Sequence, residues 1–190
     1  MRHTRNGGTF SLRTDARVAP LRHTFFGDEE VDTGVPVSPL KFDWNLNFEK
    51  QANVLACDYW RARCEGRPMP RRAELDPVAM RKFSAHVGLI DIRDAEDDYV
   101  IRRSGSRLDE VYGPITGRSI REFLPPGLQA TWRDMLGAVR AKLAPVRIVT
   151  GVDFEGKTWL NVEMLLAPLG EDGRANMIFM NFVAWPKETL

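Results

Sequence analysis

Residues 59–77 read Tyr-Trp-Arg-Ala-Arg-Cys-Glu-Gly-Arg-Pro-Met-Pro-Arg-Arg-Ala-Glu-Leu-Asp-Pro, and this stretch decides most of what the sequence predicts about the fold. Its first part ends a helical pattern, because Gly66-Arg67-Pro68 interrupts it with a flexible residue and one that cannot continue a helix. Asp76 and Pro77 then predict a short helix, with Asp76 as N-cap and Pro77 in the first helical position, where its missing N–H costs nothing. The stretch therefore joins two predicted helices through a connector rich in proline.

Upstream of this stretch, the sequence predicts an amphipathic helix over residues 47–64, with Asp43 or Asn45 as its cap. Such a helix either packs on its own domain or forms a homodimer interface, and the pattern does not decide between the two. Its apolar stripe supplies the candidate residues of a partner or dimer surface, which are Phe48, Leu55, Tyr59 and Trp60.

Downstream, the sequence alternates between strand and helix patterns. Apolar and β-branched runs predict strands at 87–92, 99–104, 146–153, 159–166 and 177–184. Helical spacing predicts short turns at 107–112 and 119–124, and a longer helix after residues 125–127 whose apolar face runs from Leu128 to Leu143 and which Pro145 ends. In the run 159–166, apolar residues alternate with mixed ones, which predicts one buried and one mixed face. The order is typical of an α+β domain with an antiparallel sheet.

Four motifs in this order resemble a PAS-like family of small, mostly alphaproteobacterial, stand-alone PAS domain proteins. They are Tyr59-Trp60, the connector 70–77, the Arg-x-x-Gly-Ser step at 102–106, and Thr116-Gly117-Arg118. The resemblance covers residues 47–185. It implies a PAS-like five-stranded antiparallel sheet with short helices on one face, preceded by the N-terminal amphipathic helix. It also implies a signalling or protein-interaction module without an attached output domain and without catalytic residues.

The resemblance breaks at Arg103, because the position after Arg102 is generally apolar in that family. An arginine there either carries its charge to the surface or points a cation into a pocket, and the first is the commoner arrangement.

The length of 190 residues accommodates one domain and an extension, which we assign as a flexible or peripheral arm (1–40) and a single PAS-like domain (41–190). A net charge of +1 argues against binding to nucleic acid or membranes through a strong overall field. No apolar run is long enough for a signal peptide or a membrane span. Cys57 and Cys64 lie too far apart along one helix to form a disulfide. We therefore expect a cytoplasmic protein with reduced thiols.

The sequence contains few candidates for a chemical site. His3, His23 and His86 belong to no ligand cluster, so we expect no metal, and no phosphate loop, nucleophile elbow or cofactor fingerprint is present. The candidates for a ligand pocket under the sheet are Tyr112, Phe123, Trp132, Met164 and Met180. These residues either pack as an ordinary core or enclose a small apolar molecule, and the sequence does not distinguish the two.

Arginines in the connector are the candidates for binding an anion. Arg67, Arg71 and Arg72 suit phosphates or acidic protein surfaces, although the acidic residues between them are equally typical of a solvated face. Nucleic acid is the less favoured partner, because no aromatic stacking platform accompanies the arginines.

The sequence thus favours a sensory or signalling module without enzymatic activity or cofactor. We expect it to act as a homodimer and through contacts with a signalling protein, and a small-molecule ligand stays open. The alternative is a small-molecule enzyme or carrier that uses the same pocket within a curved sheet.

Overall fold

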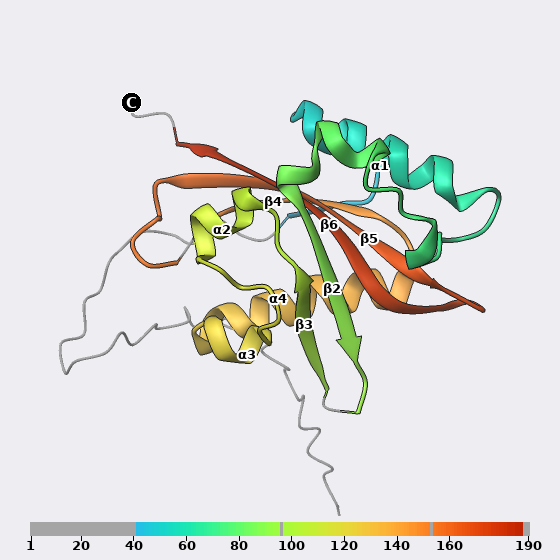
Figure 1. Ribbon diagram of the computed structural model, residues 1–190. Helices are drawn as coiled ribbons and strands as arrows, with labels where there is room; N and C mark the ends of the chain where they lie inside the picture. Colours follow the sequence, from blue (N-terminus) through green and yellow to red (C-terminus); the bar gives the residue numbers. More distant parts are fainter. Residues whose placement is uncertain (1–40, 96, 153, 188–190) are drawn as a thin grey trace, which may run out of the picture. The chain divides into compact units, whose positions relative to one another are not determined.

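The computed structural model describes residues 41–95, 97–152 and 154–187, so the predicted arm 1–40 lies outside the described residues. Six strands form one antiparallel sheet in the order β1-β4-β5-β6-β2-β3 (Figure 1). Their bounds are β1 Lys41–Asp43, β2 Val87–Arg93, β3 Asp98–Arg103, β4 Val146–Gly151, β5 Leu160–Glu171 and β6 Arg174–Pro186. This confirms the predicted α+β class. The five predicted strands are all present, and β1 adds a short sixth one beside β4.

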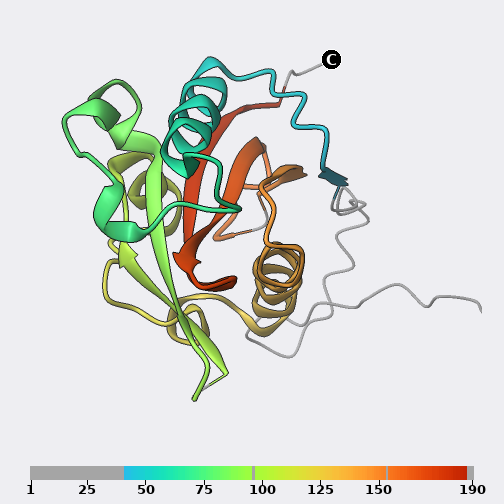
Figure 2. The same ribbon diagram turned by 90° about the vertical axis from the view of Figure 1, so that its right-hand side faces the viewer.

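Helices cover both faces of this sheet (Figure 2). Helix α1 (Gln51–Cys64) packs on one face, and α2 (Ser106–Tyr112), α3 (Ile120–Phe123) and α4 (Pro126–Lys142) pack on the other. The apolar core is divided accordingly into two clusters separated by the sheet. One cluster joins the sheet to α1 and the connector, and the larger one joins it to α2, α3 and α4.

The face predicted to be mixed is mixed at the start of β5, where Asn161 is half-buried, and is buried further along, at Glu163 and Leu165. Alternate side chains of a strand point to opposite faces. Met164 therefore enters the α4 side, whereas its neighbours Glu163 and Leu165 lie on the α1 side, and all three are at most 3% exposed. Helix α1 covers Glu163 and Leu165 and excludes solvent from this part of the sheet.

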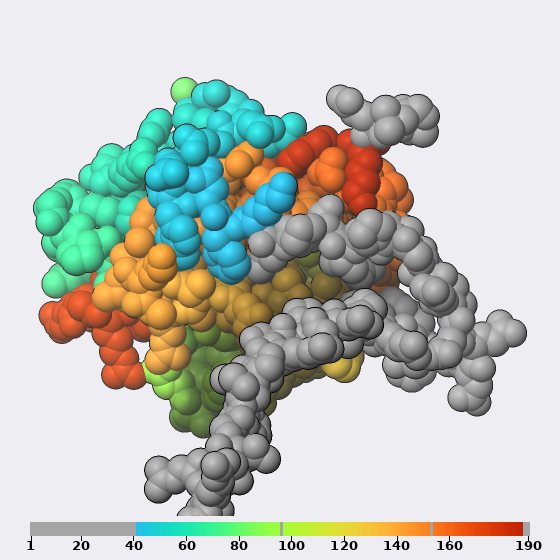
Figure 3. All heavy atoms as spheres, turned by 180° about the vertical axis from the view of Figure 1, so that it is seen from behind, coloured from blue at the N-terminus to red at the C-terminus, as the bar shows by residue number. Residues whose placement is uncertain are grey.

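Helix α1 begins at Gln51 rather than at residue 47, and its N-cap is Lys50. Asp43 does not cap it. Instead, the Asp43 carboxylate accepts hydrogen bonds from the backbone N–H groups of Asn45 (2.9 Å) and Asn47 (3.1 Å), which fixes the turn that leads from β1 to the helix. Figure 3 shows this turn in blue, lying between α1 in cyan and the orange atoms around the start of β4.

The connector and the residues that follow it form three 3₁₀ turns, η1 (Arg72–Glu74), η2 (Ala79–Lys82) and η3 (Ser84–His86), where one short helix was predicted to begin at residues 75–77. Asp76 does act as a local cap, since its Oδ1 accepts a hydrogen bond from the Val78 N–H at 2.8 Å. The chain must then reach β2 within a few residues, and short tight turns cover that distance where an α-helix would not.

The hairpin of β5 and β6 is longer than the predicted strands. It closes with Asp172 (φ 52°) and Gly173 (φ 71°), the left-handed pair that a two-residue hairpin turn requires. Pro168 is tolerated inside β5 because β4 pairs only as far as Leu166, so its missing N–H removes no bond to β4. The carbonyl of Pro168 accepts a hydrogen bond from the Trp60 indole N–H at 2.9 Å.

Arg103 is the last residue of β3, and Gly105 follows the strand. Gly105 has an ordinary φ of −81°, and a Cβ there would collide with the Ala85 carbonyl, so close approach of two backbones rather than turn geometry requires glycine. Gly113 and Gly117 do have positive φ, as expected for turns. The Arg103 side chain is exposed, which is the commoner of the two arrangements considered for it.

Candidate ligand core and partner surfaces

The five residues predicted to line a pocket come together in the cluster between the sheet and α2, α3 and α4. We call this cluster the ligand core. Tyr112 lies at the centre of an aromatic group. Its ring centroid is 5.7 Å from that of Trp132 and 6.2 Å from that of Phe123, both in edge-to-face geometry. Met164 and Met180 complete the cluster and are 3% and 0% exposed. These residues contact one another or the same neighbours, so a ligand among them would have to displace side chains.

Two ionisable side chains, Tyr99 and Tyr112, belong to this cluster among the described residues. Burial raises the pKa of both phenols, and for Tyr112 a hydrogen bond with Trp132 offsets only part of that effect. Both therefore stay protonated and neutral at physiological pH. This environment suits the binding of a small apolar molecule better than proton transfer.

A buried carboxylate, missed at the sequence level, holds α1 on the sheet. Glu163 in β5 is 0% exposed. Its carboxylate accepts hydrogen bonds from the backbone N–H groups of Glu49 and Lys50, from the Asn53 side-chain amide (each 2.9 Å), and from the Arg147 guanidinium (2.8 Å). A carboxylate at a helix N-terminus is favoured by the helix dipole, and here it comes from a strand instead of the helix itself.

The same hydrogen bonds decide the charge state of Glu163. Burial raises the pKa of this carboxyl, but the hydrogen bonds from Asn53, Glu49, Lys50 and Arg147 together bring it below its ordinary value. Asn53 continues the network, because its carbonyl oxygen accepts a hydrogen bond of 2.8 Å from Asn181 of β6. In the sequence, the one sign of this site is a glutamate between Val162 and Met164 in an apolar strand. This glutamate indicates a buried carboxylate only once helix α1 is known to cover its face of the sheet.

The predicted partner residues of α1 divide into two groups. Trp60 is 3% exposed and hydrogen-bonded to β5, so it belongs to the core of its own domain and offers no surface to a partner. Phe48, Leu55 and Tyr59 are half-buried. The Tyr59 hydroxyl accepts a hydrogen bond of 2.6 Å from the Asp76 N–H, which ties the helix to the loop of Val78.

The solvent side of α1 carries Asp58, Arg61 and Ala62, all exposed. Val78, in the adjacent loop, is 75% exposed, an unusual value for a large apolar side chain. Together with Leu55 and Tyr59, these residues define what we call the α1 surface.

The three predicted anion-binding arginines do not form one site. Arg67 makes a bidentate pair with Glu74 (2.9 and 2.8 Å), and Arg71 lies 3.1 Å from a carboxylate oxygen of Glu171. The pair raises the pKa of Arg67 and lowers that of Glu74, chiefly through their mutual hydrogen bonds. Arg72 has no carboxylate within 4.0 Å among residues 41–95, 97–152 and 154–187, and it points into a surface groove instead.

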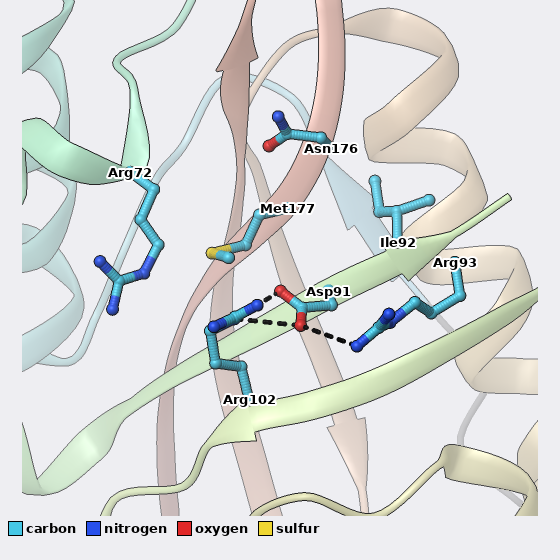
Figure 4. Close-up of a pocket in the computed structure, with 7 residues that line it drawn as sticks. All are labelled: Arg72, Asp91, Ile92, Arg93, Arg102, Asn176 and Met177. Carbon is cyan, nitrogen blue, oxygen red and sulfur yellow. Dashed lines mark hydrogen bonds and ion pairs between the residues drawn. The ribbon is translucent and has the colours of Figure 1, made fainter.

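That groove, of about 530 Å³, lies beside the strands β2, β3 and β6 (Figure 4). Its lining residues are Arg72, Asp91, Ile92, Arg93, Arg102, Asn176 and Met177. Asp91 accepts two hydrogen bonds from the Nε of Arg102 (2.8 and 3.0 Å) and lies 3.7 Å from Arg93. Two guanidinium groups, those of Arg93 and Arg102, thus flank the Asp91 carboxylate, and Arg72 lines the same groove. Of these residues, only Arg72 was among the predicted anion-binding residues. We call this site the arginine groove.

No helix among the described residues is long and apolar enough to cross a membrane. Within the same part of the chain, no three His, Cys, Asp or Glu side chains are grouped so that they could hold a metal ion.

Comparisons with known proteins point to one family. A family model described as PAS domain matches residues 48–182, which is well over half of the chain. Comparison with curated proteins gave no match, and comparison with solved structures gave none either. The matched segment contains α1, the connector, the ligand core, the Glu163 network and the arginine groove, and nearly all of the sheet except β1. The chain therefore belongs to the PAS domain family.

Proposed function

We propose that this PAS domain is a sensory module that signals through protein contacts made by helix α1 and has no catalytic activity of its own. The observation that carries the proposal is the position of Glu163 and Met164 in β5. Met164 enters the ligand core, and the adjacent Glu163 holds the N-terminus of α1 through three hydrogen-bond donors, which are the backbone N–H groups of Glu49 and Lys50 and the Asn53 amide. A change of packing around Met164 would therefore shift the anchor of α1 on the opposite face.

A small apolar molecule is the ligand class that suits such a core. Four aromatic rings surround Tyr112, the rest of the buried cluster apart from Tyr99 consists of aliphatic and thioether side chains, and the two phenols are neutral. Methionines adapt to irregular shapes, so Met164 and Met180 are the side chains best able to make room. The buried network of Glu163 transmits the change, because a fully hydrogen-bonded carboxylate has few alternative arrangements.

We assign the α1 surface to a second copy of this chain. In a two-fold symmetric contact, a residue on one copy meets a different residue on the other, and the reverse contact forms at the same time. Asp58 and Arg61 are exposed, opposite in charge and three positions apart on α1, so two antiparallel copies of the helix would pair Asp58 with Arg61 twice. Ala62 allows close approach, and Leu55, Tyr59 and Val78 supply apolar contact.

The cytoplasm is the compartment that fits this function. Cys57 and Cys64 are free thiols within the same helix, as expected in a reducing environment. Burial raises the pKa of both thiols, which keeps them protonated and poorly reactive.

Sedimentation velocity over a range of protein concentrations, combined with native mass spectrometry, tests the proposal. We expect a reversible dimer, and a bound small molecule would appear as added mass. A protein that stays monomeric at every concentration would refute the assignment of the α1 surface. Turnover of a small molecule that depends on Tyr112 would refute the absence of catalysis.

A further inference from the structure

We propose that the arginine groove binds an acidic segment of a partner protein, one in which carboxylates flank an apolar residue. The inference rests on the proposed signalling function and names the chemistry of the signalling partner, as distinct from the second copy at the α1 surface. It starts from the groove's composition. Arg72, Arg93 and Arg102 line the groove from the connector, β2 and β3, and Arg93 and Arg102 approach Asp91 (Figure 4).

The charge of the groove is only partly neutralised from within. Among the described residues, Asp91 is the one carboxylate that lines it, and this residue is 8% exposed. Asp91 orients Arg102 through two hydrogen bonds and reaches Arg93 only at 3.7 Å, so among the described residues no acceptor occupies the outer N–H groups of these two arginines. Arg72 makes no ion pair with any residue in the described ranges. Guanidinium groups held in place in this way bind carboxylates through paired N–H donors.

The other lining residues favour a peptide as the ligand of the groove. Met177 is 5% exposed and Ile92 is half-buried, so the floor between the arginines is apolar. Methionine is suited to an irregular apolar side chain. Asn176 is exposed and carries both a donor and an acceptor for a peptide backbone. Carboxylates on either side of an apolar residue match this arrangement of charge and floor.

A nucleic acid fits the groove less well. None of the seven lining residues is aromatic, so a base would find no ring on which to stack. The whole chain has a formal charge of only +1, which gives little general attraction for a polyanion.

A ligand bound in the groove would lie close to the strands on which α1 packs. Asp91 and Met177 are paired residues of β2 and β6. Leu89 and Phe179, the pair two positions away on the same strands, belong to the cluster that packs against α1. A peptide in the groove would therefore bind next to the part of the sheet on which helix α1 packs.

The test is fluorescence polarisation with a short fluorescein-labelled peptide in which glutamates flank a leucine, and with the same peptide carrying glutamines. We expect saturable binding of the glutamate peptide alone, weakening as salt is raised. Arg72→Glu should weaken it by about tenfold or more, because it removes a charged donor and adds repulsion. Arg103→Glu is the matched control, since Arg103 adjoins Arg102 but does not line the groove. It should bind almost as the parent does.

Three results would overturn the inference. They are absence of saturable binding at low salt, equal loss in Arg72→Glu and Arg103→Glu, and an oligonucleotide that binds more tightly than the peptide and depends on Arg72. Sedimentation velocity on the same samples separates this inference from the α1 surface. If the protein dimerises but does not bind the peptide, the result excludes the arginine groove as the peptide site and leaves the α1 surface unaffected. If it binds the peptide but stays monomeric, the result excludes the dimer contact and leaves the groove unaffected.

Discussion

The Asn53 side-chain amide donates a hydrogen bond of 2.9 Å to the Glu163 carboxylate, and a second one of 3.0 Å to the backbone carbonyl of the same residue. One side chain of α1 thus binds both the backbone and the side chain of one residue in β5. Asn53 and Glu163 are each 0% exposed. The contact fixes the position of the helix along the strand, whereas apolar packing alone would allow it to slide.

Replacing Glu163 by glutamine should lower the free energy of unfolding by roughly 1.5–3 kcal/mol, the range for hydrogen bonds to charged groups. Glutamine keeps the shape but loses the charge that Arg147 and the helix N-terminus require. Urea unfolding followed by circular dichroism measures the change. The matched control is Glu171→Gln at the exposed end of β5, whose pair with Arg71 is solvated. It should change stability by less than about 0.5 kcal/mol. Equal effects of the two substitutions would show that the Glu163 network does not stabilise the domain.

Acid should destabilise the domain partly through Glu163. Its pKa is below the ordinary value in the folded protein, so the stabilisation is present above the unfolded-state pKa and is lost as the pH falls through the folded-state pKa. The loss should begin below about pH 5, near the pKa of an unfolded glutamate. Urea midpoints between neutral and acidic pH should therefore fall less steeply in Glu163→Gln than in the parent protein. The pKa values of Asp43 and Asp94 are also lowered, so these two carboxyls should make the stability of both proteins fall with pH to some extent.

Alkali should destabilise the domain through the buried phenols. The raised pKa values of Tyr99 and Tyr112 mean that their stabilisation is present below the unfolded-state pKa of about 10 and is lost above it. Ultraviolet titration of the three tyrosines should show that these two resist ionisation until the protein unfolds. Tyr112→Phe should leave fewer resistant phenols and a smaller loss of stability at high pH. Complete ionisation of the folded parent near pH 10 would contradict this.

Charge reversal tests the α1 surface. Asp58→Arg and Arg61→Asp should each weaken the dimer, because each places like charges opposite one another in the two-fold contact. The double variant Asp58→Arg, Arg61→Asp restores opposite charges and should restore the dimer. Sedimentation velocity gives the dimer fraction, and circular dichroism confirms that each variant is folded. Failure of the double variant to recover, with both single variants folded, would exclude this pairing.

Leu55→Asp addresses the same surface through apolar contact. Leu55 is half-buried at the edge of the cluster beneath α1, so the substitution should reduce dimerisation and also lower stability by about 1 kcal/mol. Gln51→Ala is a suitable comparison, since Gln51 is exposed at the start of α1 and belongs neither to that cluster nor to the α1 surface. A dimer unaffected by Leu55→Asp in a folded protein would indicate that the contact lies elsewhere.

The sequence by itself determined the α+β class, the strands β2 to β6 and helix α4, because these follow from local patterns. Alternation with period two marks strands, and the spacing of Trp132, Met135, Leu136 and Val139 marks the buried side of α4. The end of α1 was equally local, since Glu65 (φ 48°) and Gly66 (φ 81°) adopt the left-handed backbone expected after a helix. The five pocket residues were also predicted as neighbours, because an antiparallel sheet with helices on one face gathers them there.

Only the tertiary structure decided what each face of these elements contacts. It buried Trp60, made Glu163 the anchor of α1, and separated Arg67 and Arg71 from Arg72 by giving the first two their own carboxylates. It also brought Arg72 together with Arg93 and Arg102, which are far away in the chain. Contacts between distant residues depend on how strands pair and where a helix docks, and no local period encodes either one. For that reason the class of fold was predictable, whereas the anchor and the arginine groove were not.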